Sequence, residues 1–261
     1  MVAAVGQAAL RAVHGDLVIP AFQPIVALAD QRMTGVEALS RFTVPDDRRS
    51  AQDWFTDAAA VGLAVDLELH AVQVALRAAR DLPAHCYVSV NLCPETLTSP
   101  ALAELLRRSP VPLPRLVVEL TEHSSVEDYE TLRCALAPFR EQGLRLAVDD
   151  AGAGYASFRH ILALAADVIK LDRTLISGVD SDPARRSLAA AVVTFAHDMG
   201  STVIAEGIET EAELRALRAL GVDSAQGYLL GRPATSRADW LAWSRPTHAP
   251  ATREVTVTEE R

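Results

Sequence analysis

Cysteine is scarce in this chain, and the cysteines present form no framework. Three occur, Cys86, Cys93 and Cys134, and no two of them stand at C-x-x-C spacing. An odd number of cysteines without a pattern supports neither a disulfide framework nor a structural zinc site. The seven histidines also lack metal-ligand spacing, and no serine lies in a G-x-S-x-G motif. The sequence therefore indicates neither a histidine metal site nor a serine nucleophile elbow.

The chain also lacks an excess of positive charge and any long apolar segment. Its net charge is −9, which argues against a general nucleic-acid surface, although a local anion site stays open. The apolar stretch 188–196 is too short to span a bilayer. The apolar segment 1–16 has no basic leader, and Arg11 interrupts it. We therefore expect no DNA partner, no membrane insertion and a cytoplasmic protein.

No Pro/Gly/Ser-rich linker divides the interior of the chain. With 261 residues and 49% hydrophobic residues, the chain can bury the core of a single enzyme-sized domain. We expect a helical lead-in at 1–17, one barrel domain at 18–244 and a disordered tail at 245–261, where Pro, Thr and charged residues mix without periodicity. About 17 residues before the first strand are too few for another domain.

Short strand-like segments alternate with helical patterns along most of the chain. The strands are predicted at 17–28, 32–42, 87–92, 115–120, 144–148, 168–171, 202–205 and 223–226. Ser99 and Asp182, each followed by proline, are predicted N-caps, and Thr210 with Glu213 forms a predicted capping box. Alternation of this kind implies a parallel sheet, closed or doubly wound. The first two strands are separated by only Ala29–Gln31, which suits a hairpin, so one strand is expected to run against the others.

Acidic, amide and basic residues stand in or at the end of most of these strands. They include Glu37, Arg41, Asn91, Glu119, Asp149, Asp150, Lys170 and Glu206. Each has an ordinary interpretation: a salt bridge between Glu37 and Arg41, a turn at Asn91, a solvated turn at Asp149–Asp150, or an ion pair between Lys170 and Asp172. A barrel of parallel strands, however, collects strand ends at one mouth. Their joint occurrence points to a carboxylate-bridged pair of divalent metals acting on a phosphate ester.

The order of these motifs resembles the EAL-domain phosphodiesterases that hydrolyse cyclic di-GMP, over roughly residues 18–240. The matching segments are Phe22–Val26, Glu37–Leu39, Val90–Leu92, Glu119–Glu122, Asp149–Asp150, Ile169–Asp172, Ala205–Gly207 and Ala225–Tyr228. The resemblance implies an α/β fold, a modified TIM (β/α)8 barrel with one antiparallel strand. It also implies hydrolysis of cyclic di-GMP to linear 5'-pGpG with two Mg²⁺ or Mn²⁺ ions.

The resemblance assigns roles to individual residues by position. It implies metal ligands at Glu37, Asn91, Glu119, Asp149, Asp150 and Glu206, of which Glu206 binds the second metal or acts as a base through its water. Lys170 would orient or stabilise the attacking hydroxide. The implied substrate-lining residues are Gln23, Leu39, Arg41, Gln226 and Pro233, with Arg41 on a phosphate. Glu209 and Glu122 would anchor the loop after Asp150.

That loop departs from the family pattern. Relatives commonly read Asp-Asp-Phe-Gly-Thr-Gly, whereas this chain has Ala151 and Ala153 in place of Phe and Thr. Neither change removes a ligand, so binding and chemistry should survive, and what changes is loop packing and any coupling between a homodimer and activity. Two alternatives stay open: a catalytically silent cyclic di-GMP receptor of the same fold, and an unrelated TIM-barrel metallohydrolase. A pure receptor has no chemical need for Glu37, Lys170 and Glu206 together.

Overall fold

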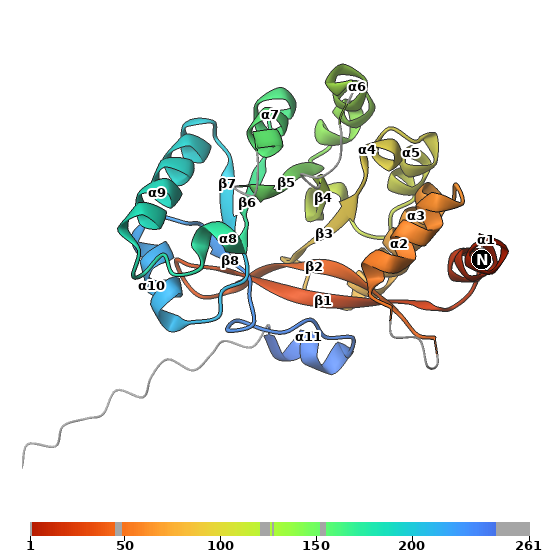
Figure 1. Ribbon diagram of the computed structural model, residues 1–261, viewed down its shortest axis with the longest axis horizontal. Coiled ribbons are helices and arrows are strands. Elements are labelled where there is room, and N and C mark those ends of the chain that lie inside the picture. The colour runs from red at the N-terminus through yellow and green to blue at the C-terminus, as the bar shows by residue number, and fades with distance from the viewer. Residues whose placement is uncertain (1, 45–48, 121–125, 127, 152–154, 244–261) are drawn as a thin grey trace, which may run out of the picture.

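The protein folds into a closed barrel of eight strands surrounded by helices (Figure 1). The computed structural model describes residues 2–44, 49–120, 126, 128–151 and 155–243. The strands are β1 (Val18–Ala27), β2 (Met33–Phe42), β3 (Tyr87–Leu92), β4 (Leu116–Leu120), β5 (Arg145–Ala151), β6 (Val168–Leu171), β7 (Thr202–Ala205) and β8 (Ser224–Ala225). They are hydrogen-bonded in sequence order, and β1 closes the barrel against β8.

Strand β1 runs against its two neighbours, while every other adjacent pair is parallel. The β1–β2 hairpin turns within a few residues and brings Gln31 to φ 60°. All eight predicted strands are present, and so are the predicted hairpin and the single reversed strand. The predicted modified TIM barrel is confirmed.

Helices cover the barrel (Figure 1), and most of them form the crossovers that parallel strands require. They are α1 (Val2–His14), α2 (Ala51–Ala60), α3 (Ala64–Ala78), α4 (Pro94–Leu97), α5 (Pro100–Arg107), α6 (Tyr129–Arg140), α7 (Tyr155–Leu164), α8 (Arg173–Ile176), α9 (Pro183–Asp198), α10 (Glu211–Ala219) and α11 (Arg237–Trp243), with 3₁₀ turns at Ala79–Asp81 and Leu113–Arg115. Ser99 and Asp182 cap α5 and α9, and Thr210 with Glu213 forms a capping box on α10. These caps were predicted.

The N-terminal helix lies outside the barrel itself. Helix α1 packs against α2 and α3 around Trp54, Ala58 and Leu67, all of which are buried. The helix falls within the segment 1–17 that the sequence marks as a helical lead-in. The predicted disordered tail, 245–261, lies outside the described residues. No helix in the described part of the chain is long and apolar enough to cross a membrane.

The barrel strands divide their side chains between two cores, because successive residues of a strand point to opposite faces. Outward residues such as Val88, Val118 and Leu146 pack under the helices. Inward residues form a small apolar layer of Ile25, Val117, Ala147, Val168 and Ile204, with Tyr87 packed against it. This layer lies toward the amino-terminal ends of the parallel strands and leaves the carboxyl-terminal end of the barrel to polar side chains.

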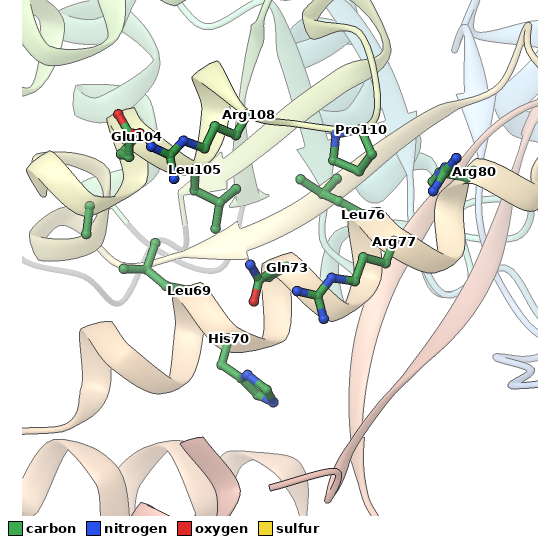
Figure 2. A pocket seen from close by; sticks show the side chains of 11 residues that line it. Leu69, His70, Gln73, Leu76, Arg77, Arg80, Glu104, Leu105, Arg108 and Pro110 are labelled. Atoms are coloured by element: carbon green, nitrogen blue, oxygen red, sulfur yellow. Dashed lines mark ion pairs between the residues drawn. The ribbon is translucent and has the colours of Figure 1, made fainter. Parts of the chain in front are cut away.

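A groove of about 600 Å³ lies between α3 and α5, on the helical shell of the protein (Figure 2). Leu69, Leu76 and Leu105 contribute apolar surface, and the charged lining residues are Arg77, Arg80, Arg108 and Glu104, which pairs with Arg108. None of the residues that the sequence marks as functional lines this groove. It therefore stands apart from the predicted site.

Candidate active site

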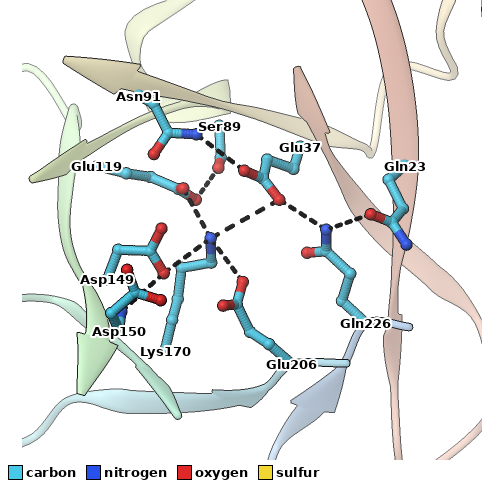
Figure 3. A network of polar contacts seen from close by, with 10 residues as sticks. All are labelled: Gln23, Glu37, Ser89, Asn91, Glu119, Asp149, Asp150, Lys170, Glu206 and Gln226. Carbon is cyan, nitrogen blue, oxygen red and sulfur yellow. Dashed lines mark hydrogen bonds and ion pairs between the residues drawn. The ribbon is translucent and has the colours of Figure 1, made fainter. Parts of the chain in front are cut away.

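The strand alternation that builds the apolar layer also places the polar site directly above it. Two residues after each inward apolar residue, the same face of the strand carries a polar one: Glu119 follows Val117, Asp149 follows Ala147 and Lys170 follows Val168. On the antiparallel strand β1 the order is reversed, so Gln23 precedes Ile25. Glu37, Glu206 and Gln226 complete this polar layer (Figure 3).

Asp149 and Asp150 share one mouth only because β5 is irregular there. In a regular strand two adjacent side chains point to opposite faces. Here the pairing with β6 steps from Val148–Ile169 to Ala151–Leu171, so β5 holds one extra residue, which is a β-bulge. Asp150 occupies the left-handed region at φ 54°. The bulge therefore delivers two neighbouring carboxylates to one site and returns Ala151 to the buried outer face.

Lys170 stands among the acids (Figure 3). Its Nζ lies 2.7 Å from Glu119 Oε2 and 2.7 Å from Glu206 Oε1. Asp149 Oδ1 is 3.2 Å away and Glu37 Oε2 is 3.7 Å away. The Lys170 side chain is 1% exposed, so these acids take the place of water around the ammonium. Asp172 instead caps α8 by accepting from Thr174 N, so the interpretation of Lys170 as the ion-pair partner of Asp172 was wrong.

Amide side chains hold Glu37 from both sides. Asn91 Nδ2 donates to Glu37 Oε1 at 2.8 Å, and Gln226 Nε2 donates to Glu37 Oε2 at 2.6 Å. Gln226 Nε2 also donates to Gln23 Oε1 at 3.0 Å. Glu37 lies in the interior of β2 rather than at its end. The register with β3 brings it to the acids, because Glu37 pairs with Ser89, whose hydroxyl contacts Glu119.

The buried acids carry more negative charge than Lys170 can balance. Burial raises the pKa of Glu119 to about 8; the Lys170 ammonium opposes this shift, and the Glu37 and Asp149 carboxylates add to it. Burial also raises the pKa of Glu206 well above its usual value. For Lys170 burial acts to lower the pKa, yet the charges of Asp149 and Glu119, with those of Glu206 and Glu37, raise it well above its usual value. The site is therefore built to take up cations or protons.

The carboxylates fall into two overlapping groups that suit two divalent cations. Oxygens of Glu37, Glu119 and Asp149 lie within 4.8 Å of one another, and so do oxygens of Asp149, Asp150 and Glu206. Asp149 belongs to both groups, as a bridging carboxylate would. All the donors are hard oxygens, the ligand type that Mg²⁺ and Mn²⁺ take. With all five carboxylates ionised and Lys170 protonated, two divalent cations would neutralise the set.

A crevice of about 880 Å³ opens beside this centre, between the β1–β2 hairpin and helices α2 and α3. Asn91, Leu39 and Arg41 line it, together with apolar residues such as Phe55 and Val72. The predicted substrate-lining residues Leu39 and Arg41 therefore meet in one cavity next to the acids. Arg41 is exposed, and its Nη1 donates to the carbonyl of Ser40.

Other predicted residues lie elsewhere. Gln23 and Gln226 lie in the polar layer rather than in the crevice, and Pro233 lies beyond β8, next to Ala234, which pairs with Phe22 of β1. Glu209 forms a bidentate ion pair with Arg173 of α8, with N–O distances of 2.6 and 2.7 Å. Glu122 and the loop residues 152–154, including Ala153, lie outside the described residues.

Sequence reasoning missed Ser89. It is 1% exposed, and its hydroxyl donates to Glu119 Oε1, on the carboxylate whose other oxygen accepts from Lys170. Ser89 stands two residues before Asn91 on β3, so both share the inward face. This alternation could have identified it.

A lysine surrounded by carboxylates, at the mouth of an eight-stranded barrel with one reversed strand, defines an α/β barrel whose acidic residues could hold a divalent cation. Comparison with known sequences narrows this class. The sequence profile of the EAL domain matches residues 7–233, and the chain belongs to the EAL domain family.

Relatives with established names support this assignment. The cyclic di-GMP phosphodiesterase PA2567 of Pseudomonas aeruginosa is 32% identical over 236 residues, which are 84% of this chain and 39% of that protein. The probable cyclic di-GMP phosphodiesterase PdeN of Escherichia coli is 26% identical over 254 residues, 94% of this chain and 49% of that protein. The chain spans about a quarter to a half of the length of the curated relatives it matches.

Solved structures share the fold over nearly the whole barrel. The PaMucR phosphodiesterase in complex with c-di-GMP has a TM-score of 0.79 at 27% identity, covering 90% of this chain and 99% of that one. BlrP1 of Klebsiella pneumoniae, in a complex with manganese and cyclic di-GMP, has a TM-score of 0.75 at 30% identity, covering 85% of this chain and 57% of that one. A complex of the same protein with calcium matches as well.

Proposed function

We propose that this chain is a cyclic di-GMP phosphodiesterase that opens one phosphodiester bond of the cyclic dinucleotide to give linear 5'-pGpG. The observation that carries the proposal is the pair of carboxylate groups that share Asp149 around Lys170. A protein that only binds the dinucleotide would have no chemical need for Glu37, Lys170 and Glu206 together. Relatives named as cyclic di-GMP phosphodiesterases, and a relative solved with manganese and cyclic di-GMP, support the same substrate and metals.

Two divalent ions, Mg²⁺ or Mn²⁺, would supply Lewis-acid polarisation of the phosphate and an activated water. The chain would hold them through Glu37, Glu119, Asp149, Asp150 and Glu206, with Asn91 as a neutral ligand. For Asn91 this requires its Oδ1 to turn toward the ion, since its Nδ2 now faces Glu37. The donor set thus fits the ions in number, charge and chemical type.

Around the acids, the remaining residues would bind and orient the substrate. Arg41 offers a planar guanidinium at the rim of the crevice, suited to a phosphate oxygen pair. Leu39 and the apolar wall of the crevice would cover part of the dinucleotide, with Pro233 on the β8 side. The Lys170 ammonium, buried below the mouth, would orient the attacking oxygen and stabilise negative charge near Glu206.

The deciding experiment incubates the purified protein with cyclic di-GMP and Mn²⁺ and separates the products by chromatography. We expect linear pGpG to form with Mn²⁺ or Mg²⁺ and none to form after chelation. The matched control is Lys170→Met, which should bind cyclic di-GMP without converting it. Binding without any product in the unaltered protein would contradict the phosphodiesterase and identify a receptor of the same fold.

A further inference from the structure

One buried acceptor in the barrel mouth has no partner among the described residues. Gln226 is 4% exposed, and its Oε1 is buried without a hydrogen bond. An unsatisfied buried carbonyl carries a free-energy cost. The amide nevertheless keeps this orientation, because its Nε2 donates to Glu37 Oε2 at 2.6 Å and to Gln23 Oε1 at 3.0 Å (Figure 3).

The direction of both amides is fixed from outside the site. Gln23 Nε2 donates to the backbone carbonyl of Gly231 at 3.0 Å, and a carbonyl can only accept. Gln23 must therefore turn its Oε1 toward Gln226, which must turn its Nε2 toward Gln23. At the other end the Glu37 carboxylate also requires a donor. Reversing either amide would place two acceptors face to face.

The anchoring carbonyl sits in a rigid part of the fold. Phe22 and Ala234 exchange two backbone hydrogen bonds of 2.9 Å, one residue before Gln23 on β1. One residue after it, Pro24 packs so closely on Gly231 that a Cβ there would lie 2.4 Å from Pro24 Cγ. Gln23 is thus held between two contacts with the same segment, which leaves the Gly231 carbonyl little room to move.

We propose that Gln23 and Gln226 are positioning residues that transmit the orientation of the Gly231 carbonyl to the Glu37 carboxylate. The chain of hydrogen bonds holds one oxygen of Glu37, so that the carboxylate presents a fixed geometry to a metal ion before any ion arrives. Gln23 then acts through Gln226 rather than by touching the substrate, which replaces the substrate-lining role that its position in the motif implies. The proposal rests on the metal centre of the proposed function.

The test measures Mn²⁺ affinity by calorimetric titration without substrate. The proteins are the unaltered chain, Gln23→Met, Gln226→Met and the double variant, since methionine keeps the length but donates no hydrogen bond. Loss of a group that orients a metal ligand typically weakens metal binding 10–100-fold, so we expect each single variant to bind Mn²⁺ at least about tenfold more weakly. The double variant should be no weaker than Gln226→Met, because Gln23 acts only through Gln226.

Two outcomes would overturn this hydrogen-bond relay from the Gly231 carbonyl to Glu37. One is unaltered Mn²⁺ affinity in Gln23→Met, and the other is losses of affinity that multiply in the double variant. A direct substrate contact by Gln23 would instead raise KM for cyclic di-GMP and leave kcat and Mn²⁺ affinity unchanged. Gln73→Met is the matched control, because Gln73 is exposed on α3 in the outer groove (Figure 2). Its Mn²⁺ affinity should equal that of the unaltered chain.

A second variant keeps the test valid if Gln23→Met does not fold. Gly231→Ala forces the anchoring segment away from Pro24 without touching any acid of the site. It should also weaken Mn²⁺ binding, and unaltered affinity in a folded Gly231→Ala protein would count against the relay. Hydrolysis by the unaltered chain together with unaltered metal affinity in the variants would overturn the relay alone. If Mn²⁺ binding weakens in the variants as predicted but the unaltered chain does not hydrolyse cyclic di-GMP, the phosphodiesterase alone would be overturned.

Discussion

Lys170 and Glu119 form a 2.7 Å ion pair inside the barrel, where each side chain is 1% exposed. A buried ion pair of this kind is balanced only as long as both partners stay, because removing one leaves an uncompensated charge. The Glu119 carboxylate is further held by the Ser89 hydroxyl. The pair therefore balances part of the negative charge of the acidic layer and gives Lys170 a structural role in addition to its proposed catalytic one.

Lys170→Met should destabilise the metal-free protein by about 3–5 kcal/mol, the usual cost of breaking a buried pair. Added Mn²⁺ should restore part of this loss, because the ions neutralise the same carboxylates. Urea unfolding in chelator and in Mn²⁺ measures both effects. Arg173→Met is the control, since its pair with Glu209 is half exposed and worth about 1 kcal/mol or less. A Lys170→Met protein as stable in chelator as the unaltered chain would contradict this account.

Glu37→Ala and Asp149→Ala should each abolish hydrolysis and leave the fold intact. Each removes a proposed metal ligand without emptying the apolar core, and in chelator each relieves repulsion among the acids. Asp149 belongs to both carboxylate groups, so its loss should reduce Mn²⁺ stoichiometry more than the loss of Glu37. Product analysis and Mn²⁺ titration check this, with Glu211→Ala on the exposed start of α10 as control. Full activity in either variant would rule out the two-metal assignment.

Much of the site could be predicted because strand alternation needs only local sequence. Glu119 and Lys170 are each two residues from a buried aliphatic residue, which fixes the face they share. The bulge at Asp150 could not be predicted, because it depends on pairing with β6. The ion-pair partners of Lys170 and Glu209 could not be predicted either. Glu119 is 51 residues from Lys170 in the chain, and Arg173 is 36 residues from Glu209.

Activity should depend only weakly on dimerisation. Ala151, the buried last residue of β5, and Ala153 after it are smaller than the Phe and Thr of the family pattern. We therefore expect weaker packing after Asp150 and weaker coupling between subunits, while the proposed metal ligands are kept. Specific activity should stay constant as protein concentration passes through any monomer–dimer transition, measured by light scattering beside the turnover assay. A steep rise in specific activity through that transition would count against the prediction.

Glu213 should make stability depend on pH at the start of α10. Partial burial acts to raise its pKa, but the backbone N–H groups of Glu209, Gly178 and Thr210 donate to its carboxylate and bring the pKa below the usual value. The ionised Glu213 carboxylate therefore stabilises the fold, and its whole contribution is present at pH values above the unfolded-state pKa of about 4.3. This contribution is lost as the pH falls through the lower pKa of the folded state.

We accordingly expect Glu213→Gln to cost about 1 kcal/mol of unfolding free energy near pH 7, as loss of a capping contact does. The difference from the unaltered chain should shrink as the pH drops below 4. Urea titrations at several pH values measure it. Glu211→Gln, two residues earlier and exposed, is the control and should show a smaller difference at every pH. A Glu213→Gln difference that grows on acidification would reverse the sign and contradict the assignment.

Metal identity should separate substrate binding from hydrolysis. Mg²⁺ and Mn²⁺ favour near-octahedral sites with short bonds, whereas Ca²⁺ accepts longer bonds and more ligands. Ca²⁺ should therefore occupy the same carboxylates but fail to activate the attacking water. A relative has been solved with both calcium and cyclic di-GMP, which agrees with binding in the presence of Ca²⁺. We expect Ca²⁺ to compete with Mn²⁺ and stop turnover while affinity for cyclic di-GMP persists. A binding titration beside a turnover assay on one preparation tests this. Undiminished turnover with Ca²⁺ alone, or activity after exhaustive chelation, would show that Lys170 and the acids act by another mechanism.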